Sequence, residues 1–295
     1  MHAVFEPGFF ESGPVHVALV VGALVAVVSA VVGTFTVIRG QSFAGHSLAD
    51  IGTTGGSAAY LLGTNALYGF VVSNLMAAGV MEVIGVRRPR GRDVATGIVL
   101  SAALGLAALF LYWDTTTTST TGATVSVLFG SIFTISSSLV PVMAVLAAIA
   151  LGVTLVLYRP LVLSSLSSDL AAARGIPVRL VGLAYLLVLA VAVSLSAIAI
   201  GAILSTALLI GPPAAALRLV KRTGAAMVAA TLLGIGATWL GVLLAYDSAS
   251  WTSSHSGWPV SFFVVAIVFL LYLLAQLLAS MRGTRRPAAR APEGA

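Results

Sequence analysis

This sequence lacks cysteine and contains few charged residues. None of the 295 residues is cysteine, and Asp, Glu, Lys and Arg together make up only 8% of the chain. The absence of cysteine excludes disulfide bonds and thiolate metal sites. Soluble domains carry about 25% charged residues, whereas 59% of this chain is hydrophobic and its mean hydropathy is +1.08. This composition predicts an integral membrane protein.

The signature motifs of enzymes are also absent. The sequence contains no HExxH, no GxSxG and no GxxxxGKS or GxxxxGKT phosphate loop. We therefore expect no catalytic activity and no permanently bound cofactor, so any energy from ATP must come from a separate chain. The net charge of +6 and the pI near 10.2 would favour nucleic acid only if the basic residues clustered on a soluble domain. The composition leaves no room for such a domain, and we expect no nucleic acid partner.

Long hydrophobic runs fill most of the chain. A run of about 20 residues crosses a bilayer as a helix, because lipid offers no partners for the polar groups of the backbone. The sequence contains nine such runs, at 15–38, 46–63, 66–85, 94–112, 139–157, 180–198, 199–217, 224–245 and 259–281. The second run is the weakest, since it is short, rich in glycine and carries Asp50. The sixth and seventh runs are continuous, and length alone separates them near Gly201.

These runs predict an all-α integral membrane protein, a polytopic bundle of eight or nine transmembrane helices. We expect one membrane domain at residues 1–281 and a basic tail at 282–295 that lies on the cytoplasmic side near anionic membrane lipid. Such a chain crosses its membrane many times.

The distribution of cations predicts the orientation of the bundle. With nine spans, one face receives every Lys and Arg of the chain: Arg39, Arg87, Arg88, Arg90, Arg92, Arg159, Arg174, Arg179, Arg218, Lys221, Arg222, Arg282, Arg285, Arg286 and Arg290. The other face receives no Lys or Arg and four acidic residues: Glu6, Glu11, Asp114 and Asp247. Since cytoplasmic loops are enriched in Lys and Arg, we predict that the N-terminus lies outside and the C-terminus inside.

One polar stretch interrupts the hydrophobic runs on the predicted inner face. The sequence LSSLSSDLAAARGIPVR, at 163–179, predicts a short helix with Ser167 or Ser168 as its cap. Gly175 is expected to end this helix, and Pro177 follows it. An ordinary loop needs only a few turn residues, so the stretch is either a longer loop or a helix on which another protein docks.

Two ionisable residues lie in the weakest predicted span. His46 and Asp50 are four residues apart, so on a helix they share one face. Both residue types bind divalent cations, and an ionisable residue inside a membrane is a functional candidate. The alternative is a hydrogen-bonded structural pair near the inner boundary. The other histidines, at positions 2, 16 and 255, fall at or near the outer side.

Four blocks of the sequence carry a further signal: GQSFAGHSLADIG, DVATGIVLSAALGLAALFL, SSDLAAARGIPVRLVGL and AIGAILSTALLIGPPAAALRL. Together they resemble the permease subunits of metal-type ABC importers, the family that handles zinc, manganese and iron(II), and this resemblance implies a multi-pass protein of the bacterial cell membrane. They occur in the order that the family has and cover roughly residues 35–245. This resemblance implies a permease that moves a divalent metal ion as its substrate.

The resemblance also implies partners. A second permease copy, most simply an identical one, two cytoplasmic ABC ATPase subunits and an extracytoplasmic solute-binding protein are expected. The segment Leu166–Gly175 would supply the coupling helix that sits in a groove of the ATPase. Asp169, Ala172 and Gly175 match the acidic, alanine and glycine positions of the family. The full set of coupling residues that we predict is Leu166, Asp169, Leu170, Ala172, Arg174 and Gly175.

The chain departs from the family pattern at one place, where Asp50 and Ile51 stand instead of Pro-Gly. The additional carboxylate is either a metal ligand or a feature of a subfamily, and His46 and Asp50 are our candidates for the translocation pathway. An alternative function is an ion-coupled secondary transporter of a small solute, with His46, Asp50 and Glu82 as a proton relay.

Overall fold

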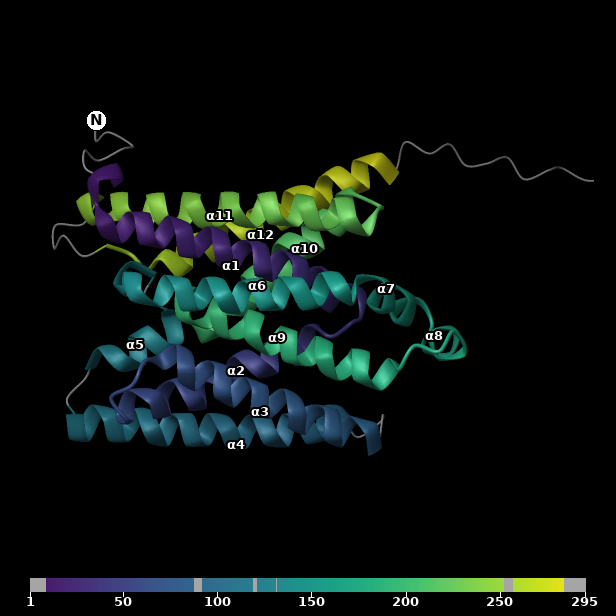
Figure 1. The fold of residues 1–295 in the computed structure, drawn as a ribbon. Coiled ribbons are helices and arrows are strands. Elements are labelled where there is room, and N and C mark those ends of the chain that lie inside the picture. The colour runs from purple at the N-terminus through teal and green to yellow at the C-terminus, as the bar shows by residue number, and fades with distance from the viewer. Residues whose placement is uncertain (1–8, 88–91, 119–120, 131, 252–256, 284–295) are drawn as a thin grey trace, which may run out of the picture.

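The computed structural model describes residues 9–87, 92–118, 121–130, 132–251 and 257–283. The regular elements of these residues are all helical (Figure 1). The helices are α1 (Gly13–Ile38), α2 (Ser42–Leu61), α3 (Ala66–Arg87), α4 (Arg92–Trp113), α5 (Thr121–Phe129), α6 (Val140–Val156), α7 (Tyr158–Leu166), α8 (Ser168–Ala173), α9 (Val178–Ile200), α10 (Ala202–Leu219), α11 (Thr223–Trp251) and α12 (Val260–Gly283). Short turns of 3-10 or π helix precede α1, follow α4 and connect α5 to α6.

Eight helices of the described chain are long and apolar enough to cross a membrane. They are α1, α3, α4, α6, α9, α10, α11 and α12, and they confirm the predicted all-α membrane bundle. Each lies within a few residues of its predicted run. The helix α2 is also 20 residues long but is not among the eight, because its Gly, Ser, Thr, His and Asp residues lower its hydropathy.

Glycine separates α9 from α10 at the place where length alone suggested a break. Gly201 has a φ of 89°, a conformation that glycine adopts without the strain that a Cβ atom causes. The predicted break near Gly201 is thus present, although α9 ends two residues after its predicted limit of 198 and α10 begins three residues after its predicted start at 199. At the C-terminal end, α12 extends to Gly283, two residues beyond the predicted end of the membrane domain. The rest of the predicted tail, 284–295, lies outside the described residues.

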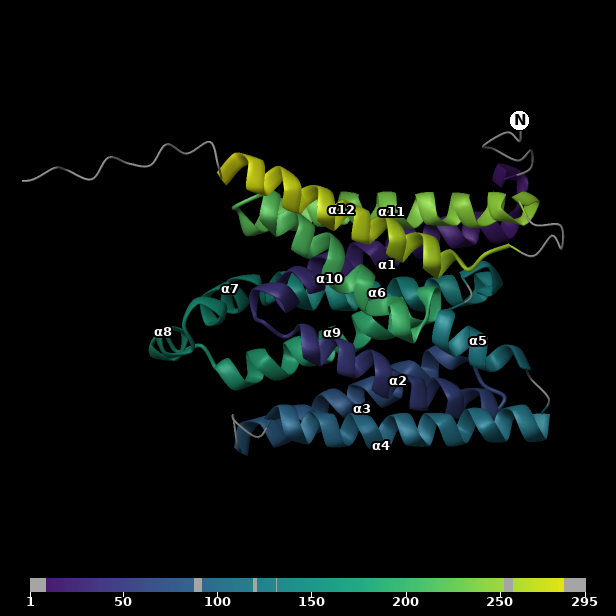
Figure 2. The same cartoon turned by 180° about the vertical axis from the view of Figure 1, so that it is seen from behind.

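Successive long helices, α2 included, run in alternate directions along the bundle (Figures 1 and 2). The first residue of α1 and the last residue of α12 therefore lie at opposite ends. The turns α1–α2 and α10–α11, the end of α3, the start of α4 and the helices α7 and α8 all lie at the same end. The described cations cluster in these connections and at the helix termini beside them. Which end faces the cytoplasm stays a prediction from the charge pattern.

The helix α9 lies at the centre of the bundle and α4 at its edge. Of the α9 span, 78% of the residues are buried, against 11% of the α4 span. A hydrogen-bond cluster joins α9 to α1, where the Tyr185 hydroxyl donates to the Val32 carbonyl at 3.1 Å and lies 2.6 Å from the Thr36 hydroxyl. Because Tyr185 is fully buried, its polar atom needs these partners.

Missing Cβ atoms allow the helices to approach closely. A Cβ atom on Gly55 of α2 would overlap the Gly69 carbonyl of α3, and a Cβ atom on Gly69 would overlap the Gly55 carbonyl. A Cβ atom on Gly33 of α1 would overlap the Leu209 carbonyl of α10. That carbonyl lacks its usual helical donor, since residue 213 is proline. The main role of the small residues in these spans is therefore to let the helices pack closely.

Candidate functional site

The connection between α6 and α9 forms an elbow of two short helices, α7 and α8, at the end of the bundle that carries the cations (Figure 1). Between them, Ser167 has extended backbone angles, φ −157° and ψ 120°. Its hydroxyl accepts a hydrogen bond from the Leu170 N–H at 3.2 Å. This side chain satisfies one of the free donors at the helix start. Of the two predicted caps, Ser167 is the one that the structure uses.

The other end of α8 is fixed by glycine. Gly175 has a φ of 76°, and its N–H donates to the Ala172 carbonyl at 2.9 Å. The next N–H, that of Ile176, donates to the Ala171 carbonyl at 3.1 Å. These two bonds form a Schellman motif. The predicted stop at Gly175 is thus present, although the helix itself is shorter than Leu166–Gly175 because Leu166 is the last residue of α7.

The residues predicted to couple this chain to a partner lie together on the surface of the elbow. All six are exposed, namely Leu166, Asp169, Leu170, Ala172, Arg174 and Gly175. Leu166 and Leu170 are 78% and 47% exposed although both are apolar. Ala171 is the buried residue of α8 and holds the elbow against its neighbours. The surface of the elbow therefore presents two exposed apolar side chains beside an exposed Asp and an exposed Arg.

The elbow is connected to the centre of the bundle by residues that the sequence did not identify. The Arg39 guanidinium, directly after α1, donates to the Ser164 hydroxyl of α7 at 2.9 Å. The same guanidinium lies 5.4 Å from the centre of the Tyr185 ring on α9, within the range of a cation–π interaction. Arg39 therefore joins α1, α7 and α9. In the sequence, its position directly after a hydrophobic run indicates only where the membrane boundary lies, so its contacts could not be predicted.

The structure places His46 and Asp50 on one face of α2, as their spacing predicted. His46 Nε2 lies 3.5 Å from Asp50 Oδ2, and the side chains are 49% and 16% exposed. The helix α2 continues through Asp50 and Ile51, the positions where the family pattern has Pro-Gly. Within the part of the chain that the structure describes, no group of three or more His, Cys, Asp or Glu residues could hold a metal ion. The alternative proton relay of His46, Asp50 and Glu82 stays a prediction.

Comparisons with known proteins agree with this architecture. Residues 14–278 match the ABC 3 transport family. The manganese transport system membrane protein MntC of Listeria innocua is 26% identical over 273 residues, which are 92% of this chain and 94% of the relative. The manganese import system permease protein ScaB of Streptococcus parasanguinis is 28% identical over 231 residues, 78% of this chain and 81% of the relative.

A solved structure has the same fold. In PsaBC from Streptococcus pneumoniae in complex with Fab, one chain superposes with a TM-score of 0.74 and 23% identity, covering 91% of this chain and 92% of that one. Because the family match extends over nearly the whole described bundle, this multi-pass membrane protein belongs to the ABC 3 transport family.

Proposed function

We propose that this chain is the membrane-spanning permease subunit of an ATP-binding-cassette importer that carries a divalent metal ion. ATP hydrolysis belongs to separate ATPase subunits, and an extracytoplasmic solute-binding protein delivers the metal. The observation that carries the proposal is the elbow of α7 and α8. It is capped at both ends, exposed along the six predicted coupling residues, and connected through Arg39 to α1 and α9.

The link through Arg39 suggests how force reaches the bundle. An ATPase that moves α7 and α8 also moves Ser164, which accepts from the Arg39 guanidinium. The guanidinium lies over the Tyr185 ring, and Tyr185 is hydrogen-bonded to the last turns of α1. A displacement of the elbow is thereby transmitted to two helices at the bundle centre, which is the coupling that an importer requires.

Manganese is the first substrate to test, with zinc and iron(II) as competitors. Relatives of this chain are named as manganese transport proteins. Carboxylate ligands suit Mn²⁺, whereas imidazole suits zinc and iron. His46 and Asp50 supply one imidazole and one carboxylate on an accessible face of α2. Two protein ligands hold a cation weakly, as a pathway requires when the ion must also leave.

A second copy of the chain completes this arrangement in our proposal. Two permeases facing one another through α2 would present two His46–Asp50 pairs to a shared pathway. The low burial of the α4 span, 11%, and of the α12 span, 22%, leaves wide surfaces beside α2 and α10. These surfaces are available to lipid or to the second copy.

The test is affinity purification of the tagged full-length chain from native membranes in mild detergent. We expect an ABC ATPase at near-equal stoichiometry, and we expect a chain with a scrambled 166–175 segment to insert but lose it. Proteoliposomes of the complex, supplied with the solute-binding protein, should then take up ⁵⁴Mn only with ATP. In the same vesicles, His46→Ala should change the ratio of manganese to zinc uptake.

Two results would contradict the proposal. A chain that purifies alone and drives uptake from an ion gradient without ATP would be the secondary transporter. An ATPase that stays bound after the 166–175 segment is scrambled would place the docking surface elsewhere. An unchanged metal ratio in His46→Ala would remove His46 from the pathway and leave the importer itself intact.

A further inference from the structure

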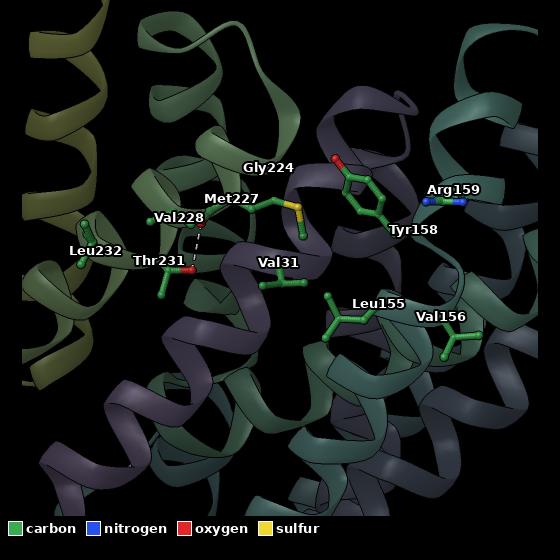
Figure 3. Close-up of a pocket in the computed structure, with 10 residues that line it drawn as sticks. All are labelled: Val31, Leu155, Val156, Tyr158, Arg159, Gly224, Met227, Val228, Thr231 and Leu232. Atoms are coloured by element: carbon green, nitrogen blue, oxygen red, sulfur yellow. Dashed lines mark hydrogen bonds between the residues drawn. The ribbon is translucent and has the colours of Figure 1, made fainter.

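A groove is lined by residues of α1, the end of α6, the start of α7 and the start of α11. Figure 1 shows where these four helices lie in the bundle. Its cavity volume is about 710 Å³. Figure 3 shows the residues that line it, namely Val31, Leu155, Val156, Tyr158, Arg159, Gly224, Met227, Val228, Thr231 and Leu232. They include one arginine and no carboxylate. The elbow α7–α8 begins at the same place, so the groove lies at the cation-rich end of the bundle.

The walls of the groove are apolar. The Thr231 hydroxyl donates to the Met227 carbonyl of its own helix at 2.9 Å, as the dashed line in Figure 3 shows. It therefore offers no donor to the groove. Leu155, Val228 and Leu232 are exposed although all three lie in membrane-spanning helices. Apolar residues with this exposure fit an acyl chain as well as they fit the surrounding lipid.

The end of the groove is polar and basic. Tyr158 packs edge-on against Phe35 with ring centres 5.8 Å apart, and a Cβ atom on Gly224 would lie 3.9 Å from the Tyr158 hydroxyl. Arg159 follows Tyr158 and is exposed. On the other side, exposed Lys221 and Arg222 directly precede α11. The first turn of this 29-residue helix adds free N–H groups and the positive end of the helix dipole.

The length of the groove matches half of a bilayer. From Gly224 to Leu232, α11 rises by about 12 Å at 1.5 Å per residue. The hydrocarbon part of one leaflet is about 15 Å deep, half of the core. An apolar groove of this length with cations at its mouth has the form of a phospholipid, with an acyl chain inside and a phosphate outside.

We propose that this groove is a site for one anionic phospholipid. One acyl chain lies between α1, α6 and α11, and the phosphate lies beside Arg159, the Tyr158 hydroxyl and the first turn of α11. Positive charge at the mouth selects an anionic headgroup over a zwitterionic one, because no carboxylate of the lining compensates it.

A second copy of this chain is not the occupant. In the proposed importer the two copies face one another through α2, which packs mainly against α3, α4, α9 and α10. The groove is built by α1, α6 and α11, which lie in front in Figure 1, whereas α2, α10 and α12 lie in front in Figure 2. This face therefore remains open to lipid when the second copy is bound.

Native mass spectrometry of the purified full-length chain tests the site. The delipidated protein is titrated with phosphatidylglycerol and with phosphatidylcholine of the same acyl chains, and we expect it to prefer phosphatidylglycerol. Arg159→Gln should lower the affinity for phosphatidylglycerol about fivefold, the effect of one cation near an anionic lipid. Arg159→Lys should keep the preference. Arg179→Gln, an exposed arginine outside the groove lining, is the matched control and should change nothing.

A second pair of variants tests the apolar part. Val228→Trp fills the groove and should lower the binding of both lipids, whereas Val145→Trp on α6, equally exposed but outside the lining, should not. Equal affinity of the parent chain for the two lipids would overturn the proposal, as would equal losses in Arg159→Gln and Arg179→Gln. If Val228→Trp split a dimer and left lipid binding unchanged, the groove would belong to a second copy and not to lipid.

Discussion

Glycine serves the α2–α3 crossing and the α7–α8 elbow in opposite ways. At the crossing, Gly55 and Gly69 are needed because a Cβ atom on either would overlap the backbone of the other helix. At the elbow, Gly175 has nothing within 4 Å of the position of a Cβ atom, but its φ is 76°. The first site requires a missing side chain and the second a backbone conformation. The same residue type therefore predicts different tolerance to substitution in the two regions.

The two regions also differ in their expected roles, since the crossing is a rigid contact between helices and the elbow is an exposed surface for coupling. The crossing has no space for a larger side chain, because helix backbones are in contact there. The elbow is exposed and is held by its cap, its Schellman motif and Arg39. Changes at the crossing should affect whether the bundle forms, and changes at the elbow should affect coupling while the bundle stays folded.

The largest effect is expected at the crossing. Gly69→Leu forces α2 and α3 apart and should destabilise the protein by about 3 kcal/mol or more, since overpacked cores relax poorly. The yield of monodisperse protein in detergent, measured by fluorescence-detected size exclusion, should collapse. Gly79→Leu on the same helix α3 is the control, because nothing lies within 4 Å of its Cβ position. Similar yields for the two variants would show that the protein tolerates a wider separation of α2 and α3.

A smaller effect on folding, but a large one on coupling, is expected at the elbow. Gly175→Pro fixes φ near −65° and removes the N–H that bonds to Ala172, so the Schellman motif cannot form. ATP-driven uptake in proteoliposomes should fall tenfold or more while membrane insertion is unchanged. Gly175→Asn is the control, since asparagine tolerates positive φ, and it should keep most of the uptake. Full uptake by the Gly175→Pro variant would show that this turn does not contribute to coupling.

The smallest effect is expected at the start of α8. Ser167→Ala removes the hydroxyl that accepts from the Leu170 N–H, and a lost N-cap costs about 1 kcal/mol. Coupled uptake should fall about two- to fivefold, and Ser167→Thr, which keeps a capping hydroxyl, should restore it. Ser168→Ala, at the neighbouring position that does not cap, should have no effect. If the two alanine variants behaved alike, the cap would not contribute to coupling.

Local patterns account for what could be predicted. Hydropathy over about 20 residues identifies a membrane span without any knowledge of its neighbours, which is why eight of the nine predicted runs are helices that can cross a membrane. The two ends of α8 were predictable for the same reason, because Ser167 and Gly175 act on the backbone within a few residues. The pairing of His46 with Asp50 followed from helix geometry alone.

Composition and local pattern were enough to predict the membrane class, the approximate spans, the gathering of cations at one end and the two ends of α8. The packed bundle alone reveals that α2 packs among the other helices despite its polarity, that Arg39 joins Ser164 and Tyr185, and that Gly55 and Gly69 meet. It also reveals the groove beside Arg159. These features depend on which residues, distant in the sequence, come into contact, and hydropathy and helix period carry no information about such pairs.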